Sequence, residues 1–241
     1  MTKKPRSGSE DSKSVRTRER ILDSAAYVLS RKGFAGTRLN DVAEHAELQA
    51  PAIYYYFKSR EELIEEVMVV GASAIRAHVV EALEELPEDA QPIDRILTAV
   101  DAHLRYTLII SDYTLAATRN GGQLPEHLRE RHDRAREEYG LVWRSLFVDA
   151  LEAGEIRSDL DVSAARMLTL GALNWAVEWW DPHGSGTVDT LVRTAQTMLL
   201  RGMASDTCSP TIPVAPAPPA KATSRKKPAA SRARKAKETA G

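Results

Sequence analysis

The sequence is poor in cysteine and has no long apolar run. The one cysteine among its 241 residues is Cys208, so an internal disulfide is excluded and a reducing compartment is expected. No stretch reaches the roughly 18 to 20 apolar residues that a membrane span needs. The polar, basic segment 1–14 also lacks the apolar core of a secretory signal. We therefore expect a cytoplasmic protein with no membrane partner.

The residue patterns of enzymes and metal sites are also missing. The histidines form no HExxH pair, and the sequence has neither a phosphate-binding glycine loop nor a GxSxG turn. His127 and His132 are five positions apart, which places them on diverging faces of a helix and disfavours a shared metal ion. We expect no catalytic activity, no cofactor and no metal.

Charge is divided unevenly along the chain. The formal net charge is −1, but residues 1–20 carry seven Lys and Arg against three Asp and Glu, and residues 205–241 carry eight against two. The ends are therefore basic, at +4 and +6, and the middle carries −11. Basic ends indicate a polyanionic partner. The tail 205–241 holds half of the prolines, and we expect both this tail and the basic arm 1–13 to be disordered.

Apolar residues recur at helical spacing from Val15 onward, and no convincing strand alternation is present. Gly33 is expected to end the first helix, and Thr37 to cap the second. Ser59 is expected to cap a long helix that ends before Pro87, with Glu62 three positions on as in a capping box. The sequence predicts an all-α fold of about nine helices in total; besides the first and the long one, they are expected at 38–46, 50–56, 93–110, 125–153, 161–180 and 187–203.

A set of spaced residues between positions 17 and 63 is typical of one DNA-binding family. The set comprises Ile21-Leu22, Ala25-Ala26, Gly33-Phe34, Thr37, Val42-Ala43 and the block IYYYFKS at 53–59, followed by Glu61 and Leu63. Over about a fifth of the chain it resembles the TetR (tetracycline repressor) family. The resemblance implies a helix-turn-helix DNA-binding domain at 14–60 and a helical effector-binding and dimerisation domain at 61–204.

The run from Gln49 to Lys58 suits the major groove of DNA. Tyr54 and Tyr55 each bring a hydroxyl and a flat ring, and three small residues precede them, so the helix N-terminus can approach the bases closely. For Tyr56 and Phe57, packing in the core is an equal or better interpretation. The resemblance implies DNA contacts by Gln49, Ala50, Pro51, Ala52, Tyr54, Tyr55 and Lys58, and by Thr37, Arg38 and Asn40 from the preceding helix.

Two further features belong to the predicted DNA-binding domain. Arg18 lies among arginines at the start of the first helix, where it suits phosphate contact, although an ordinary solvated face explains it as well. Glu47 occupies the turn position where the family commonly has glycine. A positive φ at a residue other than glycine costs about 1 kcal/mol, so a slightly different turn is possible there.

The last two helices carry an apolar stripe that a monomer would have to cover. Pairing these two helices with the same helices of a second copy, related by two-fold symmetry, forms a four-helix bundle. The two DNA-binding domains of the dimer then match the two half-sites of a palindrome. We expect a homodimer through Trp175, Trp179, Val188, Leu191, Val192, Ala195, Met198 and Leu199.

The helical body offers candidates for a ligand pocket. Arg119 is the polar group best suited to a carboxylate or phosphate, although a surface arginine is the commoner case. The segment 171–186, GALNWAVEWWDPHGSG, resembles a C-terminal type found in TetR-family regulators of lipid, sterol and acyl-CoA metabolism. The candidates are His103, Tyr106, Tyr113, Arg119, Tyr139, Trp143, Phe147, Met167, Leu170 and Asn174.

The sequence thus predicts a ligand-responsive transcriptional repressor that binds a palindromic double-stranded DNA operator as a homodimer. A small-molecule effector, such as an acyl-CoA, a fatty acid or a sterol-derived compound, is expected to release it from DNA. Two alternatives remain open. One is a regulator of drug efflux, and the other is a nucleoid-associated protein that binds any DNA through its basic tail.

Overall fold

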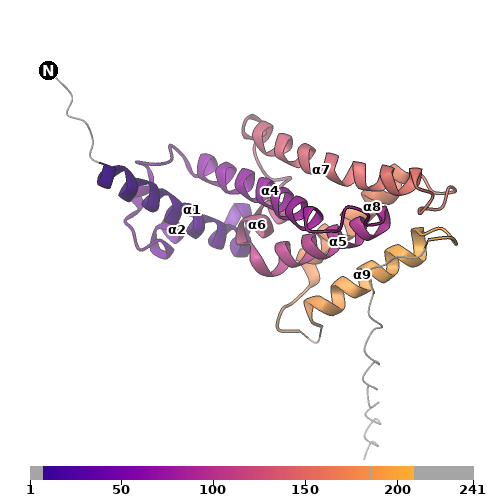
Figure 1. The fold of residues 1–241 in the computed structure, drawn as a ribbon. Helices are drawn as coiled ribbons and strands as arrows, with labels where there is room; N and C mark the ends of the chain where they lie inside the picture. Colours follow the sequence, from indigo (N-terminus) through magenta and orange to yellow (C-terminus); the bar gives the residue numbers. More distant parts are fainter. Residues whose placement is uncertain (1–7, 185, 209–241) are drawn as a thin grey trace, which may run out of the picture.

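The computed structural model describes residues 8–184 and 186–208, and its described part is built from helices (Figure 1). No strand occurs in these ranges, and β-type pairing is limited to an isolated bridge between Ile156 and Ala204. No helix in the described part is long and apolar enough to cross a bilayer. The predicted all-α fold class is confirmed.

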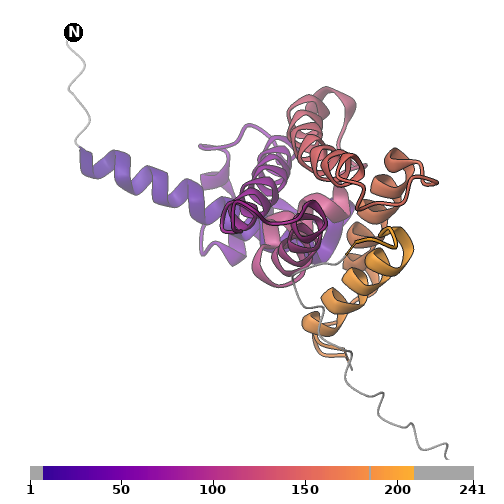
Figure 2. The same ribbon diagram turned by 45° about the vertical axis from the view of Figure 1, so that its right-hand side comes forward.

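The elements follow one another as α1 Gly8–Gly36, α2 Leu39–His45, α3 Ala50–Ile53, α4 Arg60–Glu84, α5 Pro92–Arg105, the π-helix η1 Tyr106–Ile110, α6 Asp112–Asn120, the 3-10 turn η2 Glu126–Leu128, α7 Arg129–Glu152, α8 Val162–Trp179 and α9 Val188–Met203. Two views of the ribbon place α1 and α2 at one end of an elongated molecule and α9 at the other (Figures 1 and 2).

Two hydrophobic cores divide the molecule, and α4 contributes to both. The head core joins α1, α2 and α3 with the first half of α4 and with Ala116 and Ala117 of α6. The body core joins the second half of α4 with α5, α7, α8 and α9 around Trp143 and Phe147. Since a continuous helix crosses from one core to the other, the head and the body are held in a defined relative position.

Local signals fix several helix ends as expected. The Ser59 hydroxyl accepts a hydrogen bond from the Glu62 backbone N–H at 3.0 Å, which satisfies one of the free donors at the start of α4. Asp161 and Thr187 cap α8 and α9 in the same way. Gly154 ends the turn after α7 with φ +71°, a conformation that glycine adopts without strain.

Four local predictions were wrong. Residues 8–13, expected in a disordered arm, belong to α1, whereas residues 1–7 and 209–241 lie outside the described part. The segment expected as one helix over 93–110 becomes a π-helix from Tyr106. Helix α3 ends at Ile53 rather than Tyr56, with turns following. Helix α6 was not expected, because its sequence DYTLAATRN has little apolar periodicity.

A fifth prediction, at the start of α2, was also wrong. Thr37 does not cap this helix, since the N-cap position belongs to Arg38 and carries no side-chain cap. The Thr37 hydroxyl instead donates a hydrogen bond to the Gly33 carbonyl at 2.7 Å, and the Thr37 side chain is buried. Gly33 has φ +70° and ψ 176°, so it interrupts the helical backbone near the end of α1 as predicted.

Candidate DNA-binding head and effector cavity

The turn between α2 and α3 is built around a residue in the left-handed conformation. Glu47 has φ +53°, so the turn keeps the backbone conformation typical of glycine although a glutamate occupies the position. The next residue, Leu48, donates its backbone N–H to the Ala43 carbonyl at 2.8 Å, which closes the end of α2. Pro51 then stands in the first turn of α3, where its missing N–H costs nothing.

The tyrosine run separates into exposed and buried members. Tyr54 and Tyr55 are 59% and 70% exposed, whereas Ile53 and Phe57 are buried in the head core. Tyr56 is half-buried and packs against that core with its ring edge toward Tyr55. The packing interpretation therefore holds for Tyr56 and Phe57, while two large aromatic side chains remain at the surface.

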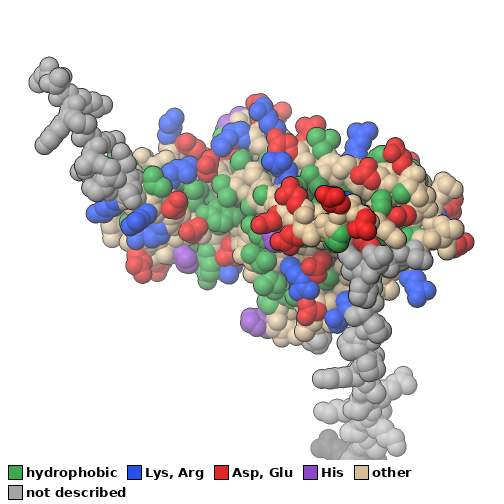
Figure 3. Space-filling view, in the orientation of Figure 1, with side chains coloured by type: hydrophobic (Ala, Val, Ile, Leu, Met, Phe, Trp, Pro, Cys, Tyr) green, Lys and Arg blue, Asp and Glu red, His purple; other side chains and the backbone are tan. Residues whose placement is uncertain are grey.

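Most of the predicted DNA-facing residues share the exposed end of the head. Arg38, Asn40, Gln49, Pro51 and Lys58 are exposed, and Ala50 and Ala52 are half-buried beside them. Arg38, Asn40 and Tyr54 also border one shallow hollow. The buried Thr37 side chain supports this surface from beneath. On the face seen in Figure 3, Lys and Arg side chains gather at this end of the molecule, and acidic side chains gather over the middle of the body.

Arg18 has a structural partner instead of a free guanidinium. Its Nη2 donates to the Glu66 carboxylate of α4 at 3.0 Å, and its guanidinium lies over the Phe57 ring at 5.1 Å. Glu66 also accepts from Arg131 of α7 at 3.1 Å. Partial burial would raise the pKa of Glu66, but its hydrogen bonds to the two arginines outweigh burial and hold this pKa below its ordinary value. Arg18 thus ties α1 to α4.

Arg60 is a head residue that sequence reasoning missed. Its Nε donates to the Thr37 carbonyl at 2.6 Å, its Nη2 contacts the Phe34 carbonyl, and its guanidinium lies over the Phe34 ring. These contacts fix the loop between α1 and α2 to the start of α4. No motif in the sequence indicates this role, because the two segments are more than twenty residues apart.

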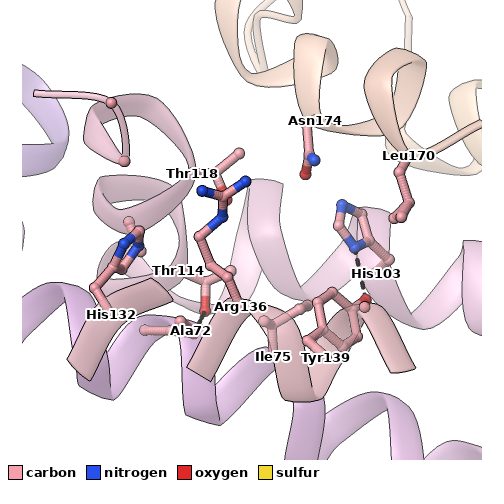
Figure 4. Close-up of a pocket in the computed structure, with 15 residues that line it drawn as sticks. Ala72, Ile75, His103, Thr114, Thr118, His132, Arg136, Tyr139, Leu170 and Asn174 are labelled. Atoms are coloured by element: carbon pink, nitrogen blue, oxygen red, sulfur yellow. Dashed lines mark hydrogen bonds between the residues drawn. The ribbon is translucent and has the colours of Figure 1, made fainter. Parts of the chain in front are cut away.

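A cavity of about 380 Å³ lies in the body, between α4, α5, α6, α7 and α8 (Figure 4). This volume is within the range of small-molecule sites. It is lined by Gly71, Ala72, Ile75, His103, Thr114, Ala117, Thr118, Gly121, Gly122, His132, Arg136, Tyr139, Gly140, Leu170 and Asn174.

His103 is a buried polar group of this cavity. Its Nδ1 is 2.8 Å from the Tyr139 hydroxyl, and its Nε2 has no hydrogen-bond partner among the described residues. Burial lowers the pKa of His103 to about 4, while the Asn174 side chain opposes part of this shift. The imidazole is therefore neutral near pH 7, and Figure 4 shows Nε2 directed toward Asn174.

The other end of the cavity carries positive charge. Arg136 is largely exposed and makes one weak ion pair, with Asp133 at 3.8 Å. His132 is buried, and its Nδ1 lacks a hydrogen-bond partner in the described part of the chain. Burial lowers the pKa of His132, and the nearby Arg136 charge lowers it further. None of the residues that line the cavity is acidic.

The cavity unites only four of the predicted ligand residues, His103, Tyr139, Leu170 and Asn174. Trp143 and Phe147 are fully buried in the body core, Tyr106 stacks on His78, and Met167 is 56% exposed on α8. These four residues, together with Tyr113 and Arg119, lie outside the cavity lining. Its members on α6, Thr114, Ala117 and Thr118, were not predicted, because helix α6 was not expected.

Tyr113 and Arg119 connect α6 to the head instead of facing a ligand. The Tyr113 hydroxyl donates to Asp23 of α1 at 2.8 Å. Arg119 donates to the Ser30 carbonyl of α1 at 2.7 Å and to the Val177 carbonyl of α8 at 2.5 Å, and it pairs with Glu178. Three partners already satisfy this guanidinium, so Arg119 is not the anion receptor that the sequence suggested.

Helices α8 and α9 present an apolar groove on the surface. Trp175, Trp179 and Met198 are 65%, 56% and 69% exposed there, and Leu168, which sequence reasoning missed, is 75% exposed. Leu191, Ala195 and Leu199 line the same groove. Val192 is buried in the body core, and Val188 packs against that core, so these two stabilise the monomer.

Both the head and the body of the chain match one known protein family. Residues 21–67 match the family described as bacterial regulatory proteins, tetR family, and residues 89–203 match the tetracyclin repressor-like C-terminal domain. The chain belongs to the TetR family. It is therefore a TetR-family transcriptional repressor and not an enzyme.

Named relatives are similar over most of their length. The transcriptional repressor KstR2 of Rhodococcus jostii is 26% identical over 78% of this chain and 91% of its own. The fatty acid metabolism regulator protein of Bacillus subtilis is 23% identical over 66% of this chain and 81% of its own. These sequence matches cover both the head and the body of this TetR-family chain.

Solved structures agree on the TetR fold. PfmR of Thermus thermophilus, a TetR-family regulator, superimposes with a TM-score of 0.66 at 26% identity, over 76% of this chain and 98% of its own. AibR, solved with isovaleryl coenzyme A and operator DNA, superimposes with a TM-score of 0.70 at 20% identity, with the same coverage. At 20% identity, the similarity to AibR shows a shared fold only.

Proposed function

We propose that this TetR-family protein is a homodimeric repressor that binds a palindromic operator through the exposed end of its head and leaves DNA when an effector fills the cavity. The observation that carries the proposal is the double role of α6. One side of α6 lines the cavity through Thr114, Ala117 and Thr118, and its other contacts hold the head.

The contacts of α6 explain how a ligand would act at a distance. The Asn120 side chain accepts the Phe34 backbone N–H at 2.8 Å, and Arg119 donates to the Ser30 carbonyl. A ligand that displaces α6 therefore displaces the end of α1 on which α2 and α3 rest. The protein would then have two arrangements of its heads, one that fits the operator and one that does not. An effector lowers DNA occupancy only if it binds more tightly to the arrangement that does not fit.

The groove of α8 and α9 supports the proposed homodimer. Soluble monomers rarely expose several large apolar side chains in one place. Two tryptophans, a leucine and a methionine are more than half exposed there. A two-fold contact would cover the same groove on both copies and would set the two heads for two half-sites of a palindrome.

The effector is proposed to come from lipid breakdown, that is, to be a fatty acid, an acyl-CoA or a sterol-derived compound. The names of the relatives support this class, since KstR2 is described as a ketosteroid regulator and the Bacillus protein as a regulator of fatty acid metabolism. The apolar wall of the cavity, with Ala72, Ile75 and Leu170, suits a hydrocarbon chain.

DNA binding is tested by fluorescence anisotropy with the duplex upstream of the protein's own gene and with a random duplex. We expect the full chain and a chain ending at Ser205 both to prefer the upstream duplex. Replacing Tyr54 and Tyr55 together by Ala is expected to weaken this preference at least tenfold, since each lost base contact costs about 1 to 3 kcal/mol.

The matched control replaces Ile109 and Ile110 by Ala, because these two apolar side chains are similarly exposed but lie on the body. The control protein should bind like the unmodified one. Two results would overturn the proposal: loss of all DNA binding on truncation at Ser205, which would make the basic tail the DNA-binding element, or unchanged recognition without the two tyrosines.

A further inference from the structure

The cavity has two polar ends of different character, separated by an apolar wall. At the buried end, the Nε2 atom of His103 has no partner and faces the cavity beside Asn174 (Figure 4). At the exposed end, the Arg136 guanidinium is directed into the cavity beside Thr118. Ile75 and Leu170 contribute apolar surface to the lining. A ligand that satisfies both ends must carry two different polar groups.

The hydrogen bond between His103 and Tyr139 decides what the buried end offers. Burial raises the pKa of Tyr139, so its phenol keeps its proton and needs an acceptor. Donation from this hydroxyl to Nδ1 of the neutral His103 satisfies it and leaves the imidazole proton on Nε2. The buried end then presents an unsatisfied N–H donor, and leaving such a donor unpaired is unfavourable.

The exposed end favours a negative charge. Arg136 is a permanent cation whose one ion-pair partner among the described residues, Asp133, is 3.8 Å away, and Asp133 does not line the cavity. His132 lies beside it with Nδ1 3.5 Å from the same Asp133 carboxylate. Since no lining residue is acidic, the lining as a whole is electropositive, and a carboxylate suits the planar guanidinium.

The size of the cavity limits the ligand. A volume of about 380 Å³ lies near the lower end of the range of small-molecule sites. A whole coenzyme A thioester exceeds this size. The cavity therefore fits a free acid of medium length.

We propose that the cavity selects a medium-length oxo- or hydroxy-carboxylic acid, with its carboxylate at Arg136 and its second oxygen at His103 Nε2 and Asn174. This inference rests on the proposed function, since it names the effector class of the proposed effector cavity. It narrows the wider lipid-derived class to free acids that carry a second hydrogen-bond acceptor.

Calorimetry on the full chain with five probes tests the proposal. The probes are octanoate, its 4-oxo and 7-oxo derivatives, methyl octanoate and octanoyl-CoA. We expect at least one oxo acid to bind about tenfold more tightly than octanoate, because its carbonyl pairs the buried donor. Methyl octanoate, which has no charge, is expected to bind more weakly than octanoate, and octanoyl-CoA more weakly than the free acid.

Two variants assign the two ends. Arg136→Gln should remove most of the difference between octanoate and its methyl ester, and the matched control Arg134→Gln, an exposed arginine of α7 outside the lining, should keep it. Asn174→Ala and His103→Leu should each reduce the advantage of the oxo acid over octanoate. Asn174 is exposed, so its replacement keeps the test valid even where His103→Leu impairs folding.

The outcomes separate this inference from the proposed function. Equal affinity for octanoate and both oxo acids, or tightest binding by octanoyl-CoA with no effect of Arg136→Gln, overturns the inference, even where that ligand releases DNA. Binding that depends on Arg136 and Asn174 but leaves the anisotropy of the DNA complex unchanged supports the inference and contradicts the release mechanism.

Discussion

His103 shows how burial alone sets the state of a single side chain. Its pKa is lowered to about 4 because the charged imidazolium would be removed from water, and its ring packs beside the aromatic rings of Tyr139 and Trp143. In the unfolded chain the same group titrates near its ordinary value of 6.5. The two states therefore bind different numbers of protons between these pH values.

A loss of stability in mild acid follows from this difference. The folded-state pKa is the lower one, so the His103 contribution is complete above pH 6.5 and is lost as the pH falls toward 4. We expect urea unfolding to show a stability loss over this range that is smaller, by up to about 3 kcal/mol, in His103→Leu. The exposed His127→Leu serves as the control and should keep the full loss. Parallel pH profiles for the unmodified protein and His103→Leu would contradict the prediction.

Glu47 illustrates strain at one backbone position. Its φ of +53° disfavours any side chain with a Cβ atom. We expect Glu47→Gly to raise the free energy of unfolding by about 0.5 to 1 kcal/mol, measured by thermal or urea unfolding. Glu44→Gly, three positions earlier inside α2, should lower it by about 1 kcal/mol, because glycine is a poor helix former. Destabilisation by both changes would show that the turn carries no strain at Glu47.

At the scale of elements, the closest approach of α4 and α6 occurs at Gly71. A Cβ atom on this residue would collide with the backbone carbonyl of Tyr113 and also touch Ala117. The Thr114 hydroxyl donates to the Gly71 carbonyl at 3.1 Å, so the same point is held by a buried hydrogen bond. Because the added Cβ atom would meet backbone atoms, no flexible side chain could move aside to make room for it.

Gly71→Ala should therefore push α6 away from α4. We expect it to lower the free energy of unfolding by about 1 to 3 kcal/mol, as overpacking does, and to weaken operator binding because α6 also holds α1. Gly140→Ala is the matched control, since a Cβ there meets nothing within 4 Å, and it should stabilise α7 by up to about 1 kcal/mol. Equal effects of the two changes on unfolding would show that this contact does not constrain α6.

The elements also show what the sequence could and could not predict. Ser59 and Gly154 act through their own neighbours in the chain, so their roles were correctly predicted from local patterns. Arg119 was misread because its partner, Ser30, lies on a distant helix and is brought close by tertiary packing. Thr37 was misread because its hydroxyl bonds back to Gly33, four residues earlier, instead of forward into α2. Three of the fifteen residues that line the cavity lie on α6, whose short polar sequence gives no periodic signal.

At the scale of the whole molecule, the exposed groove of α8 and α9 is the proposed dimer interface. We expect Trp175→Glu combined with Leu168→Glu to convert the proposed dimer to a monomer in sedimentation velocity, because two buried charges per copy would be unpaired. Leu141→Glu, at a 56% exposed leucine of α7 outside the groove, is the control and should remain dimeric. A dimer that persists in the double variant would place the interface elsewhere.

The shared core of the head limits how this protein can be recombined with others. Leu63, Val67 and Ala116 complete the packing around α1, although none of them lies within α1, α2 or α3. A chimera that joins residues 1–60 to an unrelated body would leave that packing open on one side. We expect a chimera to keep the operator preference of this protein only if it also contains the first half of α4 and a compatible α6.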